Sequence, residues 1–179
     1  MTFTVSTSTV SGRRCRGDST MTAYIDLDGD SVEIKLDGAE LALISQIPDV
    51  VASLGDGEDP AMERLHPPVA PGDPGADQTW WELVGEDLVV SRNRDALFIA
   101  EHVSPDQNVT LRLDAEQAET MLRSVNHARL IIAARLGVTY TDDAGVLEGQ
   151  NTDVIDFLGW MVEMLTDSLS RLRFAGEDG

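Results

Sequence analysis

Carboxylates at alternating positions near residue 30 are the first group in this chain whose spacing is typical of a chemical site. The run 26–30, Asp-Leu-Asp-Gly-Asp, resembles the opening of a calcium-binding loop, in which alternate carboxylates converge on a hard cation. The EF-hand pattern also requires a glycine and a glutamate where this chain has Ser31 and Asp37. Because apolar and acidic residues alternate on both sides, the run is better explained as the turn of a β-hairpin.

The histidines and glycine-rich loops give no support for catalysis. His66, His102 and His127 are far apart in the sequence, and none has the spacing of a zinc ligand. The glycine-rich segments 55–58 and 72–75 contain carboxylates that would repel a phosphate, and no Gly-x-Ser-x-Gly nucleophile motif is present. We therefore predict that the chain is not an enzyme and binds no metal or cofactor.

Cys15 is the single cysteine, so an internal disulfide is impossible. Its arginine neighbours favour the thiolate, which makes it a candidate redox residue. The alternative is an incidental residue in a disordered arm, residues 1–22, whose low hydrophobicity gives it little to bury. Met21 is also a candidate translation start, and a protein that began there would contain no cysteine.

Trp80 and Trp81 form an aromatic pair of the kind that can stack on nucleic-acid bases. Such stacking platforms lie in positively charged grooves, whereas the neighbours of this pair are acidic. We predict instead that both rings pack in the core.

Asn126 and Arg129 lie one helical turn apart on an otherwise apolar stripe. A guanidinium on such a stripe needs carboxylate or carbonyl partners, because an unpaired buried charge is strongly destabilising. Two interpretations stay open: a structural buried network, or a hot spot for binding a partner protein.

The charge balance restricts the class of partner. The chain has 13 basic and 32 acidic residues, which gives a formal net charge of -19. DNA binding depends on clustered Lys and Arg, so we expect no direct nucleic-acid binding and favour a protein partner with a basic surface. Without a secretory signal or an apolar run of about 20 residues, the sequence predicts a cytoplasmic protein with no membrane association. The oligomeric state is left open.

Alternation and capping patterns divide the first half of the chain into short elements. Alternating residues predict a hairpin over 24–36, and helical spacing predicts a helix over 38–54 that breaks or kinks at Pro48. Asp59 followed by proline begins a further short helix, and a Pro/Gly-rich loop over 67–78 follows it. The region after this loop is predicted to be helical but irregular.

The second half is predicted to contain a third short strand over 109–113 and two long core helices. The first helix runs from 115 to 136, after a capping pair, and ends at Gly137. A polar loop over 141–150 precedes the last helix, which begins near residue 151. The predicted fold class is mainly α (α+β): a single helical domain, residues 23–175, with a small hairpin or three-stranded sheet. The expected apolar faces of the two helices are Ala118, Leu122, Val125, Ile132 and Leu136, and Val154, Leu158, Met161, Leu165, Leu169 and Leu172.

Two runs, Asn126–Val138 and Phe157–Met161, resemble an actinobacterial family long known as a domain of unknown function. The shared pattern is an Asn-x-x-Arg-Leu helix ending in Arg-Leu-Gly, followed by a final helix with Leu-Gly-Trp. The similarity is clearest from about residue 85 to 172. The residues that carry the pattern here are Asn126, Arg129, Arg135, Gly137, Gly159 and Trp160.

Members of that family are described as oxidative-stress transcriptional regulators (AosR-like). The resemblance implies a non-enzymatic, stress-responsive regulator of transcription that contacts a sigma factor or RNA polymerase. Family members tend to be encoded beside the adaptor of the Clp protease, which implies an alternative function as an adaptor or accessory protein of regulated proteolysis. The single Cys15 departs from any redox switch that is built on an internal disulfide.

Overall fold

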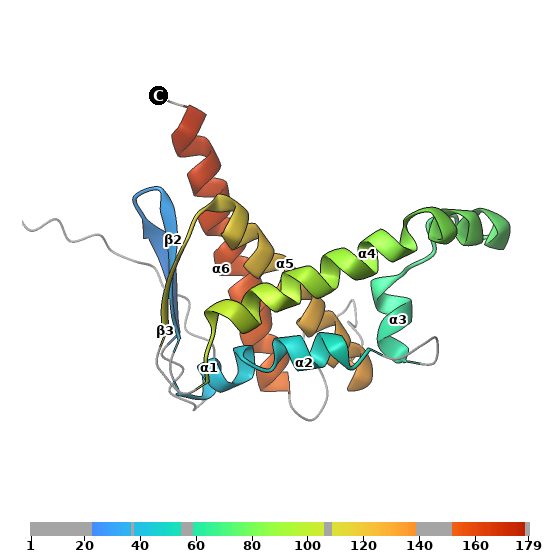
Figure 1. The fold of residues 1–179 in the computed structure, drawn as a ribbon, viewed down its shortest axis with the longest axis horizontal. Helices are drawn as coiled ribbons and strands as arrows, with labels where there is room; N and C mark the ends of the chain where they lie inside the picture. Colours follow the sequence, from blue (N-terminus) through green and yellow to red (C-terminus); the bar gives the residue numbers. More distant parts are fainter. Residues whose placement is uncertain (1–22, 37, 55–58, 106–108, 139–151, 178–179) are drawn as a thin grey trace, which may run out of the picture.

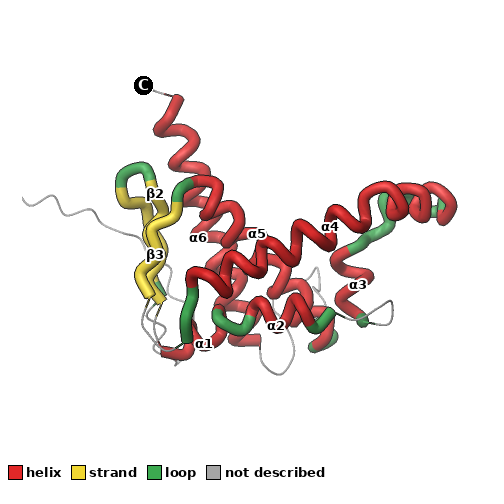
Figure 2. The backbone as a smooth tube through the Cα atoms, in the orientation of Figure 1, coloured by secondary structure: helices red, strands yellow, loops and turns green. Residues whose placement is uncertain are grey.

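A computed structural model describes residues 23–36, 38–54, 59–105, 109–138 and 152–177. It is mainly helical with a small sheet at one side (Figures 1 and 2), so the predicted α+β fold class is confirmed. One hydrophobic core takes side chains from every element. The elements are β1 (Tyr24–Asp28), β2 (Ser31–Leu36), α1 (Gly38–Ile44), α2 (Ile47–Ala52), α3 (Pro60–Leu65), α4 (Pro74–His102), β3 (Val109–Leu113), α5 (Ala115–Arg135) and α6 (Thr152–Glu177).

The sheet is antiparallel with the strand order β1-β2-β3, which confirms both the hairpin and the third strand. Ile34 pairs with Ile25 on one side and Leu111 on the other, and all three side chains are buried. Gly29 has a φ of 67°, which suits the tight turn between β1 and β2. The alternating carboxylates therefore belong to a strand and its turn, and Asp26 forms an ion pair with Arg171 of α6.

The helices α5 and α6 form the centre of the core. Asp114 caps α5, and its side chain and that of Gln117 form both bonds of a capping box, as predicted. Along α6 the expected apolar stripe is largely correct, because Leu158, Met161 and Leu165 are fully buried.

On α5 the predicted face is partly correct: Ala118 and Val125 are fully buried as expected, but the face that packs in the core is centred on other residues. Met121, Ala128 and Ile131 are fully buried, whereas Leu136 is 41% exposed. The reason is that Leu136 lies at the C-cap, where the chain leaves the helix before the side chain can reach α6.

The break at Pro48 is confirmed, because α1 and α2 are separate helices and the proline lies in the first turn of α2. The predicted loop over 67–78 is too long, since α4 begins at Pro74. Asp73 is the N-cap and accepts a hydrogen bond from the Ala76 amide at 3.1 Å. Asp77 instead accepts bonds from the amides of Val69 and Ala70 and so holds the preceding turn against the helix.

The middle of the chain forms one continuous helix, α4, of 29 residues, not the irregular helical region that we expected. Figure 1 shows its N-terminal half reaching away from the sheet and the two core helices. The prediction that Trp80 and Trp81 pack in the core is wrong. Trp80 is 37% exposed, and Trp81 covers Gly85 and contacts the tilted ring of His66, with the ring centroids 4.1 Å apart. Both tryptophans are near the N-terminal end of α4, which lies beyond the reach of the α5–α6 core.

None of the helices in the described residues is long and apolar enough to cross a membrane.

Candidate functional site

Arg135 holds the C-terminal end of α5 against two other helices. Its guanidinium donates to the Asp59 carboxylate at 2.6 Å and to the Ser53 carbonyl and hydroxyl, each at 2.9 Å. Asp59 is the N-cap of α3, and Ser53 is the C-cap of α2. One side chain therefore satisfies the ends of two helices, and this residue of the family motif has a structural position.

Gly137 ends α5 in the left-handed conformation that favours glycine, with a φ of 65°. Its amide donates to the Ala134 carbonyl, and the Val138 amide donates to the Ala133 carbonyl, which is the Schellman pattern of a helix end. Arg64 of α3 donates to the Val138 carbonyl at 2.6 Å. The Arg-Leu-Gly motif thus forms a clasp in which α2 and α3 hold the end of α5.

Arg129 is partly buried and donates to the Asn126 side chain at 3.1 Å. Within the described residues this amide oxygen is its only hydrogen-bond partner, so the predicted network with carboxylates is not seen there. The contact stays within one turn of α5 and connects no other element. Its geometry leaves both earlier interpretations of the pair open.

Gly159 and Trp160 lie in the N-terminal half of α6 and are both partly buried. A side-chain atom added at Gly159 would meet nothing within 4 Å. Trp160 stacks on Phe157 with the ring centroids 5.9 Å apart. The motif residues are therefore spread along α5 and α6 and do not converge on one cavity.

An ion pair that the sequence analysis missed joins α4 to α5. Asp95 is 2% exposed and receives two hydrogen bonds from Arg123, at 2.7 and 3.0 Å. The same contact raises the pKa of the Arg123 guanidinium. Ser124 donates to the Asp95 backbone carbonyl at 2.6 Å, so both the side chain and the main chain of this residue are fixed by α5.

Beside this pair lies a buried cation with a neutral partner. Arg92 is 6% exposed and donates to His66 Nε2 at 2.8 Å, which requires that this nitrogen carries no proton. Burial and the nearby Arg92 charge both lower the pKa of His66 and of His127. The Nδ1 atom of His127 is buried and has no hydrogen-bond partner among the described residues. The cluster therefore favours neutral histidines at physiological pH.

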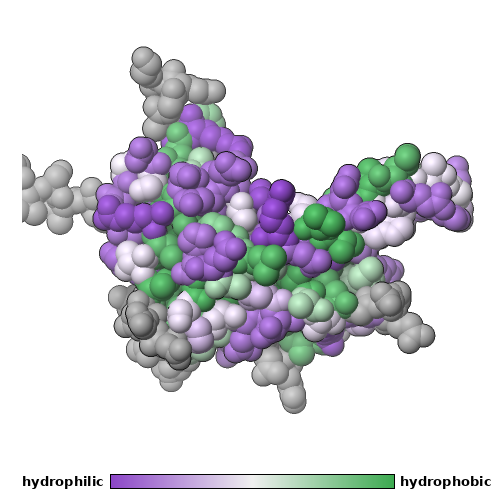
Figure 3. Space-filling model, viewed as in Figure 1, coloured by the Kyte–Doolittle hydropathy of each residue, from purple (hydrophilic) through white to green (hydrophobic). Residues whose placement is uncertain are grey.

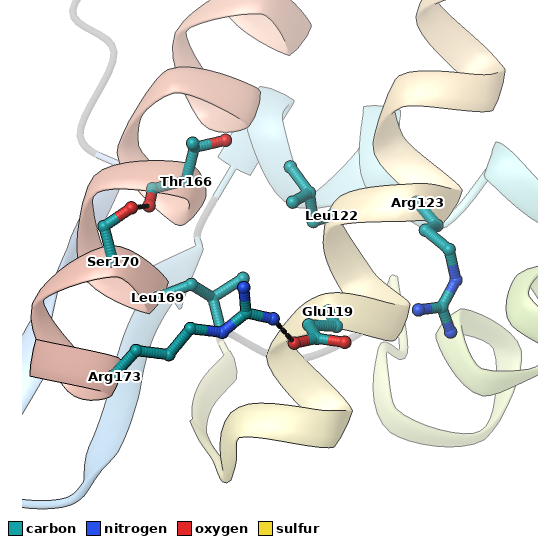
Figure 4. A pocket seen from close by; sticks show the side chains of 7 residues that line it. All are labelled: Glu119, Leu122, Arg123, Thr166, Leu169, Ser170 and Arg173. Atoms are coloured by element: carbon teal, nitrogen blue, oxygen red, sulfur yellow. Dashed lines mark hydrogen bonds and ion pairs between the residues drawn. The ribbon is translucent and has the colours of Figure 1, made fainter. Parts of the chain in front are cut away.

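A hollow of about 250 Å³ between α5 and α6 is lined by seven side chains (Figure 4). Arg123 and Arg173, the cations at this hollow, are bound to Asp95 and Glu119. Ligand pockets have volumes of roughly 300–1,000 Å³, so the hollow is small for an organic substrate. Among the described residues there is also no group of three or more acidic or histidine side chains placed to hold a metal ion. Cys15 lies outside the described residues.

The outer surface of α4 carries six of the ten large apolar side chains that are exposed in the described residues. Its N-terminal part, residues 73–91, also contains five carboxylates and no lysine or arginine. Figure 3 shows green hydrophobic surface among purple along the diagonal course that α4 follows in Figure 1. A surface that combines apolar and acidic groups is suited to contact with another protein. The exposed apolar residues are Trp80, Leu83, Leu88, Val89, Val90 and Leu97.

A family model described as a domain of unknown function, DUF2017, matches residues 21–169. The chain belongs to this family. The match includes the three strands, the first five helices and most of α6, so the clasp, the Asp95–Arg123 pair and α4 are all parts of the DUF2017 domain. No curated protein and no solved structure gave a significant match.

Of the two features of this DUF2017 domain that were not predicted, one had a signal in the sequence and the other had none. Leu83, Val90 and Leu97 recur every seven residues, a spacing that indicates an apolar stripe on one side of a helix. The Asp95–Arg123 pair had no such signal, because its residues are 28 positions apart and belong to different helices.

Proposed function

We propose that this DUF2017 protein is a non-enzymatic, stress-responsive regulator of transcription that acts by contacting a basic surface of a sigma factor or RNA polymerase. The observation that carries this proposal is the distribution of charge. The resemblance of the α5 and α6 motifs to AosR-like oxidative-stress regulators supports the class of partner. The charge distribution supports the mode of action, which is contact with a protein and not with DNA.

Most cations of the described residues are bound within the fold. Arg92 is buried, Arg64 donates to a backbone carbonyl and Arg129 to an amide oxygen. With the net charge of the chain at -19, the described residues offer little positive surface for phosphates. The cations that form ion pairs with carboxylates are Lys35, Arg112, Arg123, Arg135, Arg171 and Arg173.

The excess of acidic groups would attract a basic protein surface. Such attraction mainly raises the association rate, and salt screens it over about 8–10 Å at ionic strengths near physiological. We therefore expect the complex with the transcription component to weaken as salt rises from low to physiological strength. The acidic N-terminal half of α4 is the most suitable contact region, because its carboxylates have no cation among them.

The proposal is tested by pull-downs of the full chain against purified sigma factors and RNA polymerase, with gel-shift titrations in parallel. Retention of a transcription component without a DNA shift supports it. Tight, sequence-specific DNA binding would contradict the argument from charge. Retention of Clp-type protease components in place of transcription components would favour the adaptor function.

A charge-reversal pair locates the contact. Glu82→Lys on α4 should slow association with the basic partner by about two- to tenfold at low salt. Glu163→Lys on α6 is the matched control, because Glu163 is also an exposed helical glutamate but lies on another helix. Equal effects of the two substitutions would show that the overall charge, and not the α4 surface, attracts the partner.

A further inference from the structure

The helix α4 has two stripes of residues that repeat every seven positions and differ in burial. Gly85, Arg92 and Ile99 are all buried against the fold. Leu83, Val90 and Leu97, which we call the outer stripe, are 75%, 58% and 58% exposed. The two sets are offset by two residues, and at 3.6 residues per turn this places them on nearly opposite sides of the helix. The core of this chain therefore does not explain the outer stripe.

Single exposed apolar side chains are ordinary, but an aligned set is not. The outer stripe extends over about 21 Å at a rise of 1.5 Å per residue, which is the length of a helix–helix contact of four turns. A seven-residue repeat keeps the apolar side chains along one line and is the spacing with which two helices pack side by side. The occupant that fits this stripe best is another helix.

Charged residues beside the outer stripe indicate which helix packs against it. Glu86 and Arg94 are each four residues from Val90, on opposite sides along the chain, and both are exposed. Within the part of the chain that the structure describes, neither side chain has a hydrogen-bond or ion-pair partner. Two copies of α4 that run antiparallel about Val90 would bring Glu86 of each opposite Arg94 of the other. The same arrangement places Leu83 against Leu97 and Val90 against its own copy.

A parallel pair or a basic partner fits this pattern less well. In a parallel arrangement Glu86 would meet Glu86 and Arg94 would meet Arg94, which is repulsive. A basic partner helix would meet Arg94 in the middle of the stripe. A partner helix must place a cation opposite Glu86 and a carboxylate opposite Arg94. A second copy of α4, related by a two-fold axis, does both.

We propose that two copies of this chain associate through the outer stripe of α4, antiparallel and with the two-fold axis at Val90. The dimer is centred on Val90, whereas Glu82, the residue that tests the contact with a transcription component, lies one residue before Leu83 and points about 100° away from it around the helix. Salt should also affect the two contacts differently. Association of two chains that each carry -19 is opposed by repulsion that salt screens, so the dimer should not weaken at physiological salt.

The interface is tested by sedimentation of the full chain over a dilution series. The wild type should show a monomer–dimer equilibrium. Val90→Glu, which places two carboxylates together on the axis, should raise the dissociation constant by about tenfold or more. Val89→Glu is the matched control, because Val89 is also exposed, at 40%, but lies off the stripe. Circular dichroism of both variants checks that the helical fold is kept.

Charge exchange tests the antiparallel arrangement. Arg94→Glu should weaken the dimer, and adding Glu86→Arg to the same chain should restore it, because each pair is then re-formed with its charges reversed. In a Cys15→Ser background, Val90→Cys should form a disulfide between copies on mild oxidation, since identical residues meet at the axis. Arg94→Cys should not form this disulfide, because each introduced cysteine would lie opposite Glu86 of the other copy.

Each outcome bears on the proposal. A wild type that is monomeric at every concentration, or a dimer that Val90→Glu leaves unchanged, would overturn it. Failure of the double charge exchange to restore the dimer would reject the antiparallel arrangement. These results are independent of the proposed function: a monomer that retains the sigma factor refutes only the dimer, and a dimer that retains no transcription component refutes only the regulator.

Discussion

The α5–α6 core and the outer stripe of α4 both consist of apolar side chains, but only those of the core are buried. On α6, Leu158, Met161 and Leu165 are completely buried, whereas on α4 Leu83 and Val90 are more than half exposed. An apolar stripe that packs against another helix of the same chain stabilises the fold, because each Å² of apolar surface removed from water contributes about 25 cal/mol. A stripe that faces solvent gives no such stability to the monomer. The comparison therefore separates side chains that support folding from those available for binding.

The largest expected difference comes from truncating one leucine in each region. Leu158→Ala should lower the free energy of unfolding by about 3 kcal/mol, because it removes buried methyl groups and leaves a cavity. Leu97→Ala should change it by less than about 0.5 kcal/mol under conditions where the chain is monomeric. Chemical denaturation measures both values. A large loss for Leu97→Ala would show that the outer stripe belongs to the fold itself.

The attachment of α4 to α5 depends on the pair between Asp95 and Arg123. Arg123→Ala should destabilise the protein by about 2 kcal/mol, because it leaves the Asp95 carboxylate buried without its cation. In a protein that already carries Asp95→Asn, Arg123→Ala should lower the free energy of unfolding by less than it does in the wild type. A double-mutant cycle by denaturation measures this coupling. Additive effects of the two substitutions would show that the pair contributes nothing beyond its separate residues.

The two glycines of the family motif should respond to alanine in opposite directions. Gly137→Ala should cost about 1 kcal/mol, because its φ of 65° is strained for a residue with a side chain. Gly159→Ala should stabilise by about 0.5–1 kcal/mol, since this glycine is inside a helix with open space beside it. Thermal unfolding of both variants measures the contrast. Destabilisation by Gly159→Ala would place this glycine at a contact that the monomer does not contain.

The smallest expected effect is a pH dependence at the junction of α3, α4 and α5. Burial and Arg92 hold the pKa of His66 and of His127 below their usual range, so the unfolded chain takes up protons first as pH falls. Stability from these groups is complete above the histidine pKa of the unfolded chain, about 6.5, and is lost below it. The unfolding midpoints at pH 7 and pH 5 should therefore differ less in a variant with both histidines replaced by glutamine than in the wild type. An unchanged difference would assign the pH dependence to the carboxylates.

Sequence patterns predicted the elements better than the site. Capping residues such as Asp59 and Asp114 were recognised because their bonds reach only two or three residues along the chain. The length of α4 was missed because the prolines of the preceding loop concealed the N-cap at Asp73. The role of Arg135 was not predicted, because its partner Asp59 is 76 residues away. For Arg129, partial burial and a hydrogen bond are confirmed, but the expected carboxylate partner is not seen in the described residues.

The sequence by itself determined where strands and helices form and which sign of charge the surface carries, because both depend on residue type and on neighbours along the chain. Only the tertiary structure decided which side of α4 is buried. Its apolar residues lie all round the helix, so no local pattern distinguishes Ile99, which is fully buried, from Leu97, which is 58% exposed. The difference arises because α2 and α5 cover one side of α4. That leaves its outer stripe open to a second molecule.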